Sequence, residues 1–97
     1  MRYSFHPAAK KEFYEAIDYY EDCQMGLGLE FAKELYDTID RIIRFPNAWP
    51  QFSSNTKRCL TNRFPFGIIY QIIHNEIFII AIMQLNRKPN YWKKRTN

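Results

Sequence analysis

Three arginines and one tyrosine in the second half of the chain have the groups that metal-free RNA cleavage would need. Arg58, Arg63 and Arg87 could stabilise the charge that develops on a phosphorane, and Tyr91 could transfer a proton. The reaction also needs a base for the 2′-hydroxyl and an acid for the leaving oxygen. The arginines could equally be solvated charges at strand ends, and Tyr91 could cap a core, so both interpretations stay open.

The charges of the chain are divided between its halves. Residues 1–49 hold nine of the ten acidic and six of the fourteen basic side chains, a net charge of −3, whereas residues 50–97 hold one acid and eight bases, a net charge of +7. A field of one sign over half of a chain attracts polyanions or an acidic partner. The second half is therefore predicted to face the functional partner.

Residues 86–95 alternate basic and aromatic side chains. This pattern suits phosphates, bases or an acidic protein groove. We predict that a target contacts basic and aromatic residues of the second half, namely Arg58, Arg63, Arg87, Lys88, Tyr91, Trp92 and Arg95. For Tyr91 and Trp92, a role in capping the core is the alternative.

Hydrophobic periodicity predicts the elements that position these residues. Residues 2–6 alternate as a short strand does, and Pro7 suits the first turn of a helix. Apolar residues at helical spacing predict helices over residues 7–22 and 29–45, joined by a tight bend at Gly26-Leu27-Gly28. The two helices are expected to form an antiparallel hairpin.

Three strands are predicted after a loop that ends near Thr56. The segments with strand-like patterns are residues 57–63, 66–73 and 76–84. His74-Asn75 suits a tight turn between the last two. The sequence therefore predicts one α+β domain over residues 1–97, in which the helical hairpin covers one face of a mostly antiparallel sheet and a short C-terminal tail follows.

Metal and cofactor sites are not expected. His6 and His74 have no carboxylate or thiol at ligand spacing, and the Gly26-Leu27-Gly28 bend lacks the lysine and hydroxyl of a P-loop. No secretion signal or apolar run of about 20 residues is found, which predicts a cytoplasmic protein without membrane contact. Cys23 and Cys59 are therefore expected to stay reduced.

Five short motifs follow one another along the chain. They are AIDYYE at 16–21, GLG at 26–28, AWP at 48–50, RFPFGIIY at 63–70 and RKPNYW at 87–92. In this order and at these spacings they resemble the RelE/ParE superfamily of toxins from bacterial type II toxin–antitoxin systems. RFPFGIIY and the Pro-Asn-Tyr-Trp tail are similar to the ParE-like branch.

The resemblance implies a small toxin that a cognate antitoxin neutralises by laying an acidic or amphipathic segment over it, as part of a hetero-oligomer. ParE-like members act on DNA gyrase and block replication, and this is the activity we expect. RelE-like members instead cut messenger RNA at the ribosome, which is the first alternative. A non-toxic relative that only binds partners is the second.

The ribonuclease alternative would use Arg63, Arg87 and Tyr91. Arg87 matches a late-strand arginine of RelE-like ribonucleases, and Tyr91 lies near their C-terminal tyrosine. Their central-strand arginine is replaced by Gly67, their final-strand histidine by Gln84 or Leu85, and their lysines have no counterpart in residues 49–56. Losing members of a proton-transfer set usually costs orders of magnitude in rate, so the resemblance favours a toxin without catalytic residues.

The antitoxin is expected to bind an apolar groove on the helices. A stripe of apolar residues there exceeds what the sheet is expected to cover. Its members are Phe13, Ile17, Tyr20, Phe31 and Leu35. The alternative is that all five belong to the core.

Overall fold

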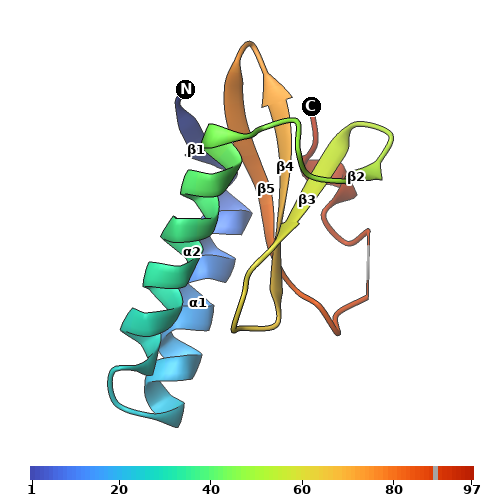
Figure 1. Ribbon diagram of the computed structural model, residues 1–97. Coiled ribbons are helices and arrows are strands. Elements are labelled where there is room, and N and C mark those ends of the chain that lie inside the picture. The colour runs from blue at the N-terminus through green and yellow to red at the C-terminus, as the bar shows by residue number, and fades with distance from the viewer. Residues whose placement is uncertain (89) are drawn as a thin grey trace.

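The computed structural model describes residues 1–88 and 90–97 (Figure 1). The elements are β1 (Tyr3–Phe5), α1 (Pro7–Cys23), α2 (Leu27–Arg44), β2 (Gln51–Ser53), β3 (Thr56–Leu60), β4 (Phe66–Ile73), β5 (Glu76–Gln84) and the 3₁₀ helix η1 (Lys93–Arg95). The predicted α+β fold is confirmed. No helix among the described residues is long and apolar enough to cross a bilayer.

The five strands form one sheet in the order β1-β5-β4-β3-β2. β1 runs parallel to β5, and the other neighbours are antiparallel. His74 and Asn75 have φ of 51° and 62° between β4 and β5, which is the left-handed backbone that a two-residue hairpin needs. The tight turn predicted at these residues is confirmed.

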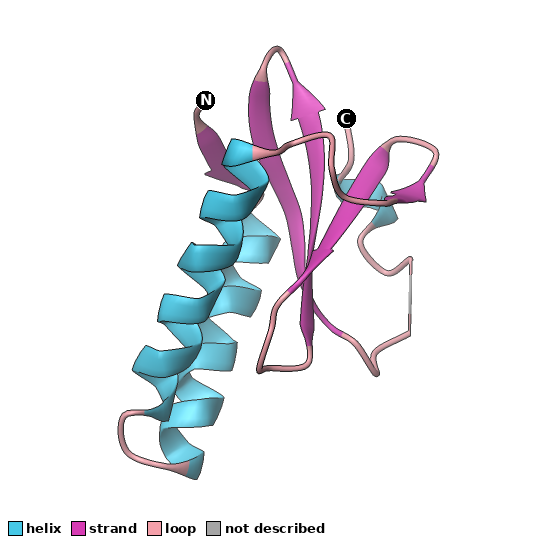
Figure 2. Cartoon of the chain, viewed as in Figure 1, coloured by secondary structure: helices cyan, strands magenta, loops and turns pink. Residues whose placement is uncertain are grey.

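α1 and α2 cover one face of the sheet (Figure 2). Phe13 of α1 and Phe31 and Leu35 of α2 are buried together against Ile68 and Tyr70 of β4. The Tyr70 hydroxyl donates to the Pro46 carbonyl at 2.7 Å, so this buried phenol fixes the loop that follows α2. The main core is therefore rich in aromatic rings.

Helix α2 begins two residues earlier than predicted, so Gly28 lies inside it. Gly26, with φ of 85°, makes the bend. A Cβ atom at Gly28 would lie 2.6 Å from the Ile17 carbonyl oxygen, so the helices touch here. The Glu21 carboxylate accepts the N–H groups of Gly26 at 2.9 Å and Gly28 at 3.1 Å, and so caps α2.

The opposite face of the sheet has its own apolar layer. Trp92 of the C-terminal tail is 1% exposed and packs with Ile69, Ile80, Ala81 and Met83. Gln71 of β4 anchors the tail further on, since its side-chain amide donates to the Asn97 oxygen at 3.3 Å and accepts the Asn97 N–H at 3.0 Å. The tail is thus a structural layer.

Strand β2 lies in the segment that was predicted to be a loop. It pairs with β3 through Gln51 and Lys57, and the Phe52 ring lies 5.8 Å from the Trp92 ring. A three-residue strand is too short to show an alternating pattern, and its partner Trp92 is distant in sequence. For these reasons the sequence did not indicate it.

Candidate target-binding site

Strand β5 loses its outer strand partner halfway along its length. β1 ends at Phe5, and the next N–H, that of His6, donates to the Ile79 carbonyl at 2.8 Å. Beyond that point the Ile82 N–H donates to Glu12 at 3.1 Å, and the Ile80 carbonyl accepts from Arg95 at 3.2 Å. Because buried backbone groups need partners, a carboxylate from α1 and a guanidinium from the tail complete this edge.

Glu12 and Arg95 form a close, partly buried ion pair at the sheet edge. Two Arg95 nitrogens lie 2.9 Å and 3.3 Å from the Glu12 carboxylate oxygens, and the side chains are only 15% and 17% exposed. A bidentate pair of this kind is charge-assisted and geometrically specific. Arg87, which is 54% exposed, approaches the same carboxylate at 3.7 Å.

Tyr91 completes the group that we call the arginine–tyrosine cluster: Glu12, Arg87, Tyr91 and Arg95. The guanidinium carbons of Arg87 and Arg95 lie 3.8 Å and 5.1 Å from the centre of the Tyr91 ring, within the range of cation–π attraction. The Tyr91 hydroxyl is buried and has no hydrogen-bond partner among residues 1–88 and 90–97.

The proton of Tyr91 is held tightly. Burial, and then the negative charge of Glu12, raise the pKa of the Tyr91 phenol above its ordinary value of 10.0. The side chain therefore stays neutral at physiological pH. A proton-transfer residue works best with a pKa near the operating pH, so this environment does not suit Tyr91 to general acid–base catalysis.

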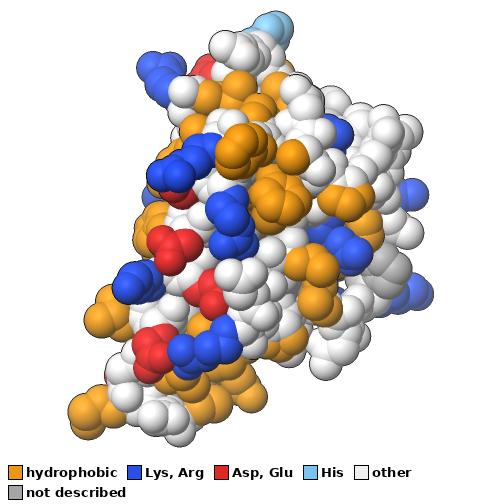
Figure 3. All heavy atoms as spheres, in the orientation of Figure 1, with side chains coloured by type: hydrophobic (Ala, Val, Ile, Leu, Met, Phe, Trp, Pro, Cys, Tyr) orange, Lys and Arg blue, Asp and Glu red, His pale blue; other side chains and the backbone are white. Residues whose placement is uncertain are grey.

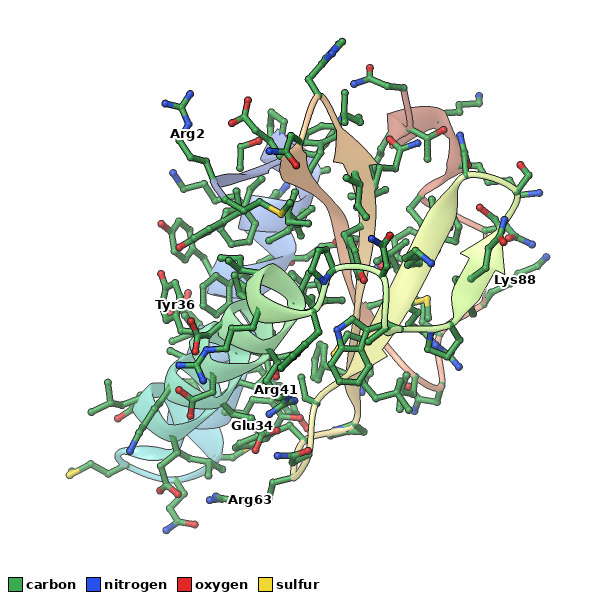
Figure 4. All side chains as sticks on the ribbon, turned by 45° about the horizontal axis from the view of Figure 1, so that its top comes forward. Arg2, Glu34, Tyr36, Arg41, Arg63 and Lys88 are labelled. Atoms are coloured by element: carbon green, nitrogen blue, oxygen red, sulfur yellow. The ribbon has the colours of Figure 1, made fainter. Side chains whose placement is uncertain are left out.

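Arg63 lies apart from this cluster. Its guanidinium is 2.7 Å from the Glu30 carboxylate on α2, and the N–H groups of Arg63 and Phe64 donate to Glu34 at 2.9 Å and 3.0 Å. Figure 4 shows Arg63 and Glu34 near one another, with Lys88 on another side of the molecule. The set Arg63, Arg87 and Tyr91 is not assembled, because α2 holds the loop that carries Arg63.

Arg58 takes the space beside Gly67 on the sheet. Its guanidinium carbon lies 4.4 Å from the centre of the Phe52 ring. A Cβ atom at Gly67 would lie 3.2 Å from the Cγ and Cδ atoms of Arg58. The Arg58 stem thus crosses the place where a side chain at position 67 would begin, which gives a physical reason for glycine there.

Trp92 does not offer the contact surface predicted for it. The indole is 1% exposed because it fills the space above Ile69 and Met83, so its role is to pack the second core. Lys88 is exposed and makes no ion pair with the described residues. Of the seven predicted target-binding residues, Arg87, Tyr91 and Arg95 come together.

A groove with a cavity volume of about 390 Å³ adjoins the cluster, between α1 and the sheet. Glu12 and Arg87 line this groove and also belong to the arginine–tyrosine cluster. The apolar and aromatic part of the groove lining is Ala16, Tyr19, Tyr20, Phe66 and Ile82. Such a surface, apolar with a few charges, fits an amphipathic protein segment.

The groove is not formed by the residues that the sequence suggested. Phe13, Phe31 and Leu35 are 1%, 0% and 0% exposed, so they belong to the core and present no surface. The helices and the sheet together cover these three residues of the stripe. Ile17 and Tyr20 are partly exposed, and of the five only Tyr20 also lines the groove.

Two residues of importance were not singled out from the sequence. Glu12 sits beside the buried stripe of α1, next to Phe13, but it is one of nine acidic residues in α1 and α2, and its position in the sequence does not distinguish it from the other eight. Gln71 is a polar residue inside the apolar run 66–73, and a buried amide at such a place needs dedicated partners. That interruption was the available signal for Gln71.

The strand, the helical hairpin and the five-stranded sheet form the fold of the RelE/ParE toxins. A solved structure described as the chromosomal ParDE toxin–antitoxin system of P. aeruginosa superposes with a TM-score of 0.75 at 16% identity, covering 89% of this chain and 97% of that one. The isolated E. coli RelE toxin superposes with a TM-score of 0.65 at 15% identity, covering 96% and 93%.

Residues 3–89 match the family described as the ParE toxin of the type II toxin–antitoxin system parDE. The chain belongs to this family and is therefore a type II toxin of the ParE-like branch. A search of curated proteins found no match. Family membership implies a cognate antitoxin as partner.

Proposed function

We propose that this toxin arrests bacterial growth in the cytoplasm by binding DNA gyrase, without a catalytic step, and that its antitoxin neutralises it. Membership of the ParE toxin family supports this proposal. The non-catalytic action is supported by the contacts within the arginine–tyrosine cluster. Glu12 forms an ion pair with Arg95 and lies near Arg87, and the hydroxyl of Tyr91 is buried.

A ribonuclease needs an acid, a base and free cations around one phosphate. In this chain Arg63 is paired with Glu30 on α2, Tyr91 holds its proton, and position 67 has no side chain. Arg58, Arg87 and Lys88 remain as cations for contact with an acidic protein surface. Such contacts contribute to recognition and association rate without any proton transfer.

The antitoxin occupies the groove beside α1 in this proposal. Tyr19, Tyr20 and Phe66 offer apolar contact to an amphipathic segment, and Arg87 at the groove offers charge. Because Arg87 belongs to both the groove and the cluster, a segment bound there covers a target-binding residue at the same time. Neutralisation then follows from occlusion.

The test is a gyrase supercoiling assay beside a messenger-RNA cleavage assay in a translation system. We expect the purified toxin to inhibit supercoiling and to leave messenger RNA intact. Arg87→Ala should weaken inhibition about tenfold or more, and Tyr91→Phe should retain it within about threefold, since only a hydroxyl is lost. Arg2→Ala, at an exposed ion pair with Glu76, serves as the control without effect.

Two other outcomes decide against the proposal. Cleavage of messenger RNA by the toxin, lost in Tyr91→Phe while the fold is retained, would establish the ribonuclease alternative. A soluble, folded toxin that affects neither gyrase nor translation, and that does not arrest growth on strong expression, would establish a partner-binding relative.

A further inference from the structure

The outer sides of the two helices carry exposed aromatic and apolar side chains. Tyr3, Tyr14, Leu29 and Tyr36 are 38%, 52%, 75% and 48% exposed, and we call these four residues the tyrosine face. Separate orange side chains alternate with blue and red ones along the left margin of the helices in Figure 3, and Figure 4 shows Tyr36 on this outer side. Exposed apolar surface of this kind marks interaction sites.

Tyr14 and Tyr36 of the tyrosine face pack against the same buried ring, that of Phe13. The rings of Tyr14 and Tyr36 lie 5.9 Å and 5.5 Å from the Phe13 ring. Burial, and then the phenols of Tyr3 and Tyr14, raise the pKa of Tyr36, which places the three hydroxyls in one neighbourhood. Leu29 lies on the same side of α2, two turns before Tyr36.

This face is separate from the candidate target-binding site. Residues two apart on a helix point to different sides, so Glu12 and Tyr14 face away from each other on α1. Glu12 is turned to the β5 edge, whereas Tyr14 is turned to the outer surface. A partner on the tyrosine face therefore leaves the groove and the cluster free.

The charges that flank the tyrosines have opposite signs on the two sides, four residues away on α1 and three and four residues away on α2. Lys10 and Asp18 lie four residues, or about 6 Å, on either side of Tyr14 along one stripe of α1. On α2, Lys33 and Asp40 lie on either side of Tyr36. Lys10, Asp18 and Lys33 make no ion pair with any described residue, and Asp40 contacts Arg44 at 3.1 Å.

We propose that the tyrosine face binds a second copy of this chain, with the helices antiparallel about a two-fold axis near Tyr14 and Tyr36. A two-fold axis reverses the direction of each helix, so Lys10 of each copy comes opposite Asp18 of the other. The same operation brings Lys33 opposite Asp40. Within one chain Lys10 and Asp18 are about 12 Å apart along the helix and cannot pair.

Self-complementary charge is what selects a second copy among possible occupants. An unrelated segment has no reason to repeat this sign reversal about a central tyrosine on both helices. Tyrosine is also enriched in protein interfaces, where it supplies large contact area at small entropy cost. The surface is limited to two helix faces about 25 Å long, so we expect a weak dimer with a dissociation constant in the micromolar range.

Sedimentation velocity of the purified toxin, from micromolar to near-millimolar concentration at low salt, tests the proposal. We expect a concentration-dependent dimer. Lys10→Glu and Asp18→Lys should each weaken association about tenfold, because each places like charges opposite one another, and the double variant should restore it to within about threefold. Restoration requires contact between copies, since the two residues do not touch within one chain.

Tyr14→Ala and Tyr19→Ala form the matched pair on α1. Both tyrosines are exposed, at 52% and 64%, but Tyr19 lines the groove on another side of the helix. Tyr14→Ala should weaken the dimer about tenfold and Tyr19→Ala should not change it. A monomer at every concentration, or single charge reversals without effect, or a double variant that stays as weak as the single variants, would overturn the proposal.

Discussion

Among single residues, Glu12 contacts three different partners through one carboxylate. It accepts the Ile82 N–H, binds Arg95 with two contacts and lies near Arg87. Removing one member of a partly buried pair leaves the other charge without compensation, which costs more than the pair gains when intact. Glu12 is therefore a structural link between α1, β5 and the tail.

We expect Glu12→Gln to lower the free energy of unfolding by about 1–3 kcal/mol, because Arg95 loses its counter-charge at a site that is only 17% exposed. Glu15→Gln is the matched control one turn away. Glu15 is 66% exposed and lies 3.9 Å from Lys11, so its substitution should change stability by less than about 0.5 kcal/mol. Urea denaturation measures both, and equal effects would contradict the structural role of Glu12.

Two buried phenols make the fold sensitive to alkali. Burial raises the pKa of Tyr70 and of Tyr91 above 10.0. A group with a raised folded pKa contributes its stability below the unfolded pKa and loses it as pH rises through the folded one. The unfolded chain releases these protons near pH 10 and the folded chain retains them, so stability must fall above that pH.

Each retained proton should add about 1.4 kcal/mol per pH unit to the loss of stability above roughly pH 10. Tyr91→Phe removes one such proton and should flatten the slope by about that amount. Tyr19→Phe, at an exposed side chain, is the control for the loss of a hydroxyl as such. Denaturation at several alkaline pH values gives the slopes, and identical slopes for Tyr91→Phe and the parent would show that Tyr91 ionises freely in the folded chain.

At the scale of elements, the tail is the second covering layer of the sheet. Helices α1 and α2 bury one face, and Trp92 buries Ile69, Ile80 and Met83 on the other. Phe52 on β2 adds to this layer, and the Glu12–Arg95 pair and the Gln71–Asn97 contacts secure it. Removing the tail would therefore expose apolar sheet surface, and single substitutions are the cleaner test of its contacts.

Trp92→Ala should destabilise the protein by about 3–5 kcal/mol, because it removes a buried aromatic side chain and leaves a cavity above the sheet. Lys93→Ala, at the exposed neighbouring residue, should cost less than about 0.5 kcal/mol. Thermal or urea denaturation compares the two. A small effect of Trp92→Ala would mean that the tail is not a packed layer in solution.

At the scale of the whole molecule, the two charge signs belong to different layers. Acidic residues are concentrated in the helices, and the +7 half supplies the sheet and the tail. Part of that positive charge is neutralised locally, since Arg95 pairs with Glu12 and Arg63 pairs with Glu30. The basic residues that remain to act on a partner at longer range are Lys57, Arg58, Arg87, Lys88, Lys93 and Lys94.

Association with an acidic antitoxin should therefore slow about tenfold or more between low and high ionic strength, as screening shortens the range of these charges. The dissociation rate should change less, since apolar groove contacts are insensitive to screening. Lys93→Ala with Lys94→Ala should reduce the salt dependence. Stopped-flow association rates that do not change with ionic strength would show that these charges do not steer association.

Local patterns in the sequence predict both helices and the strands β1 and β3 to β5 in their correct order, but not β2. Helices α1 and α2 and strands β3 to β5 follow from apolar periodicity, which is local and is written at spacings of two or of three to four residues. The turn at His74-Asn75 follows from the backbone preference of its residues. The family motifs predict the fold class, because they lie at fixed positions along these elements.

Which residues form the site depends on tertiary contacts. Arg63 and Arg87 are both arginines that follow or precede a strand in the sequence. In the fold, Arg63 pairs with Glu30 on α2, whereas Arg87 contacts Glu12, which is distant in sequence. Trp92 in a basic and aromatic segment fits a contact residue and a core residue equally well, until the sheet face beneath it is known. The physical reason is that ion pairing and burial depend on residues distant in sequence, which local patterns do not contain.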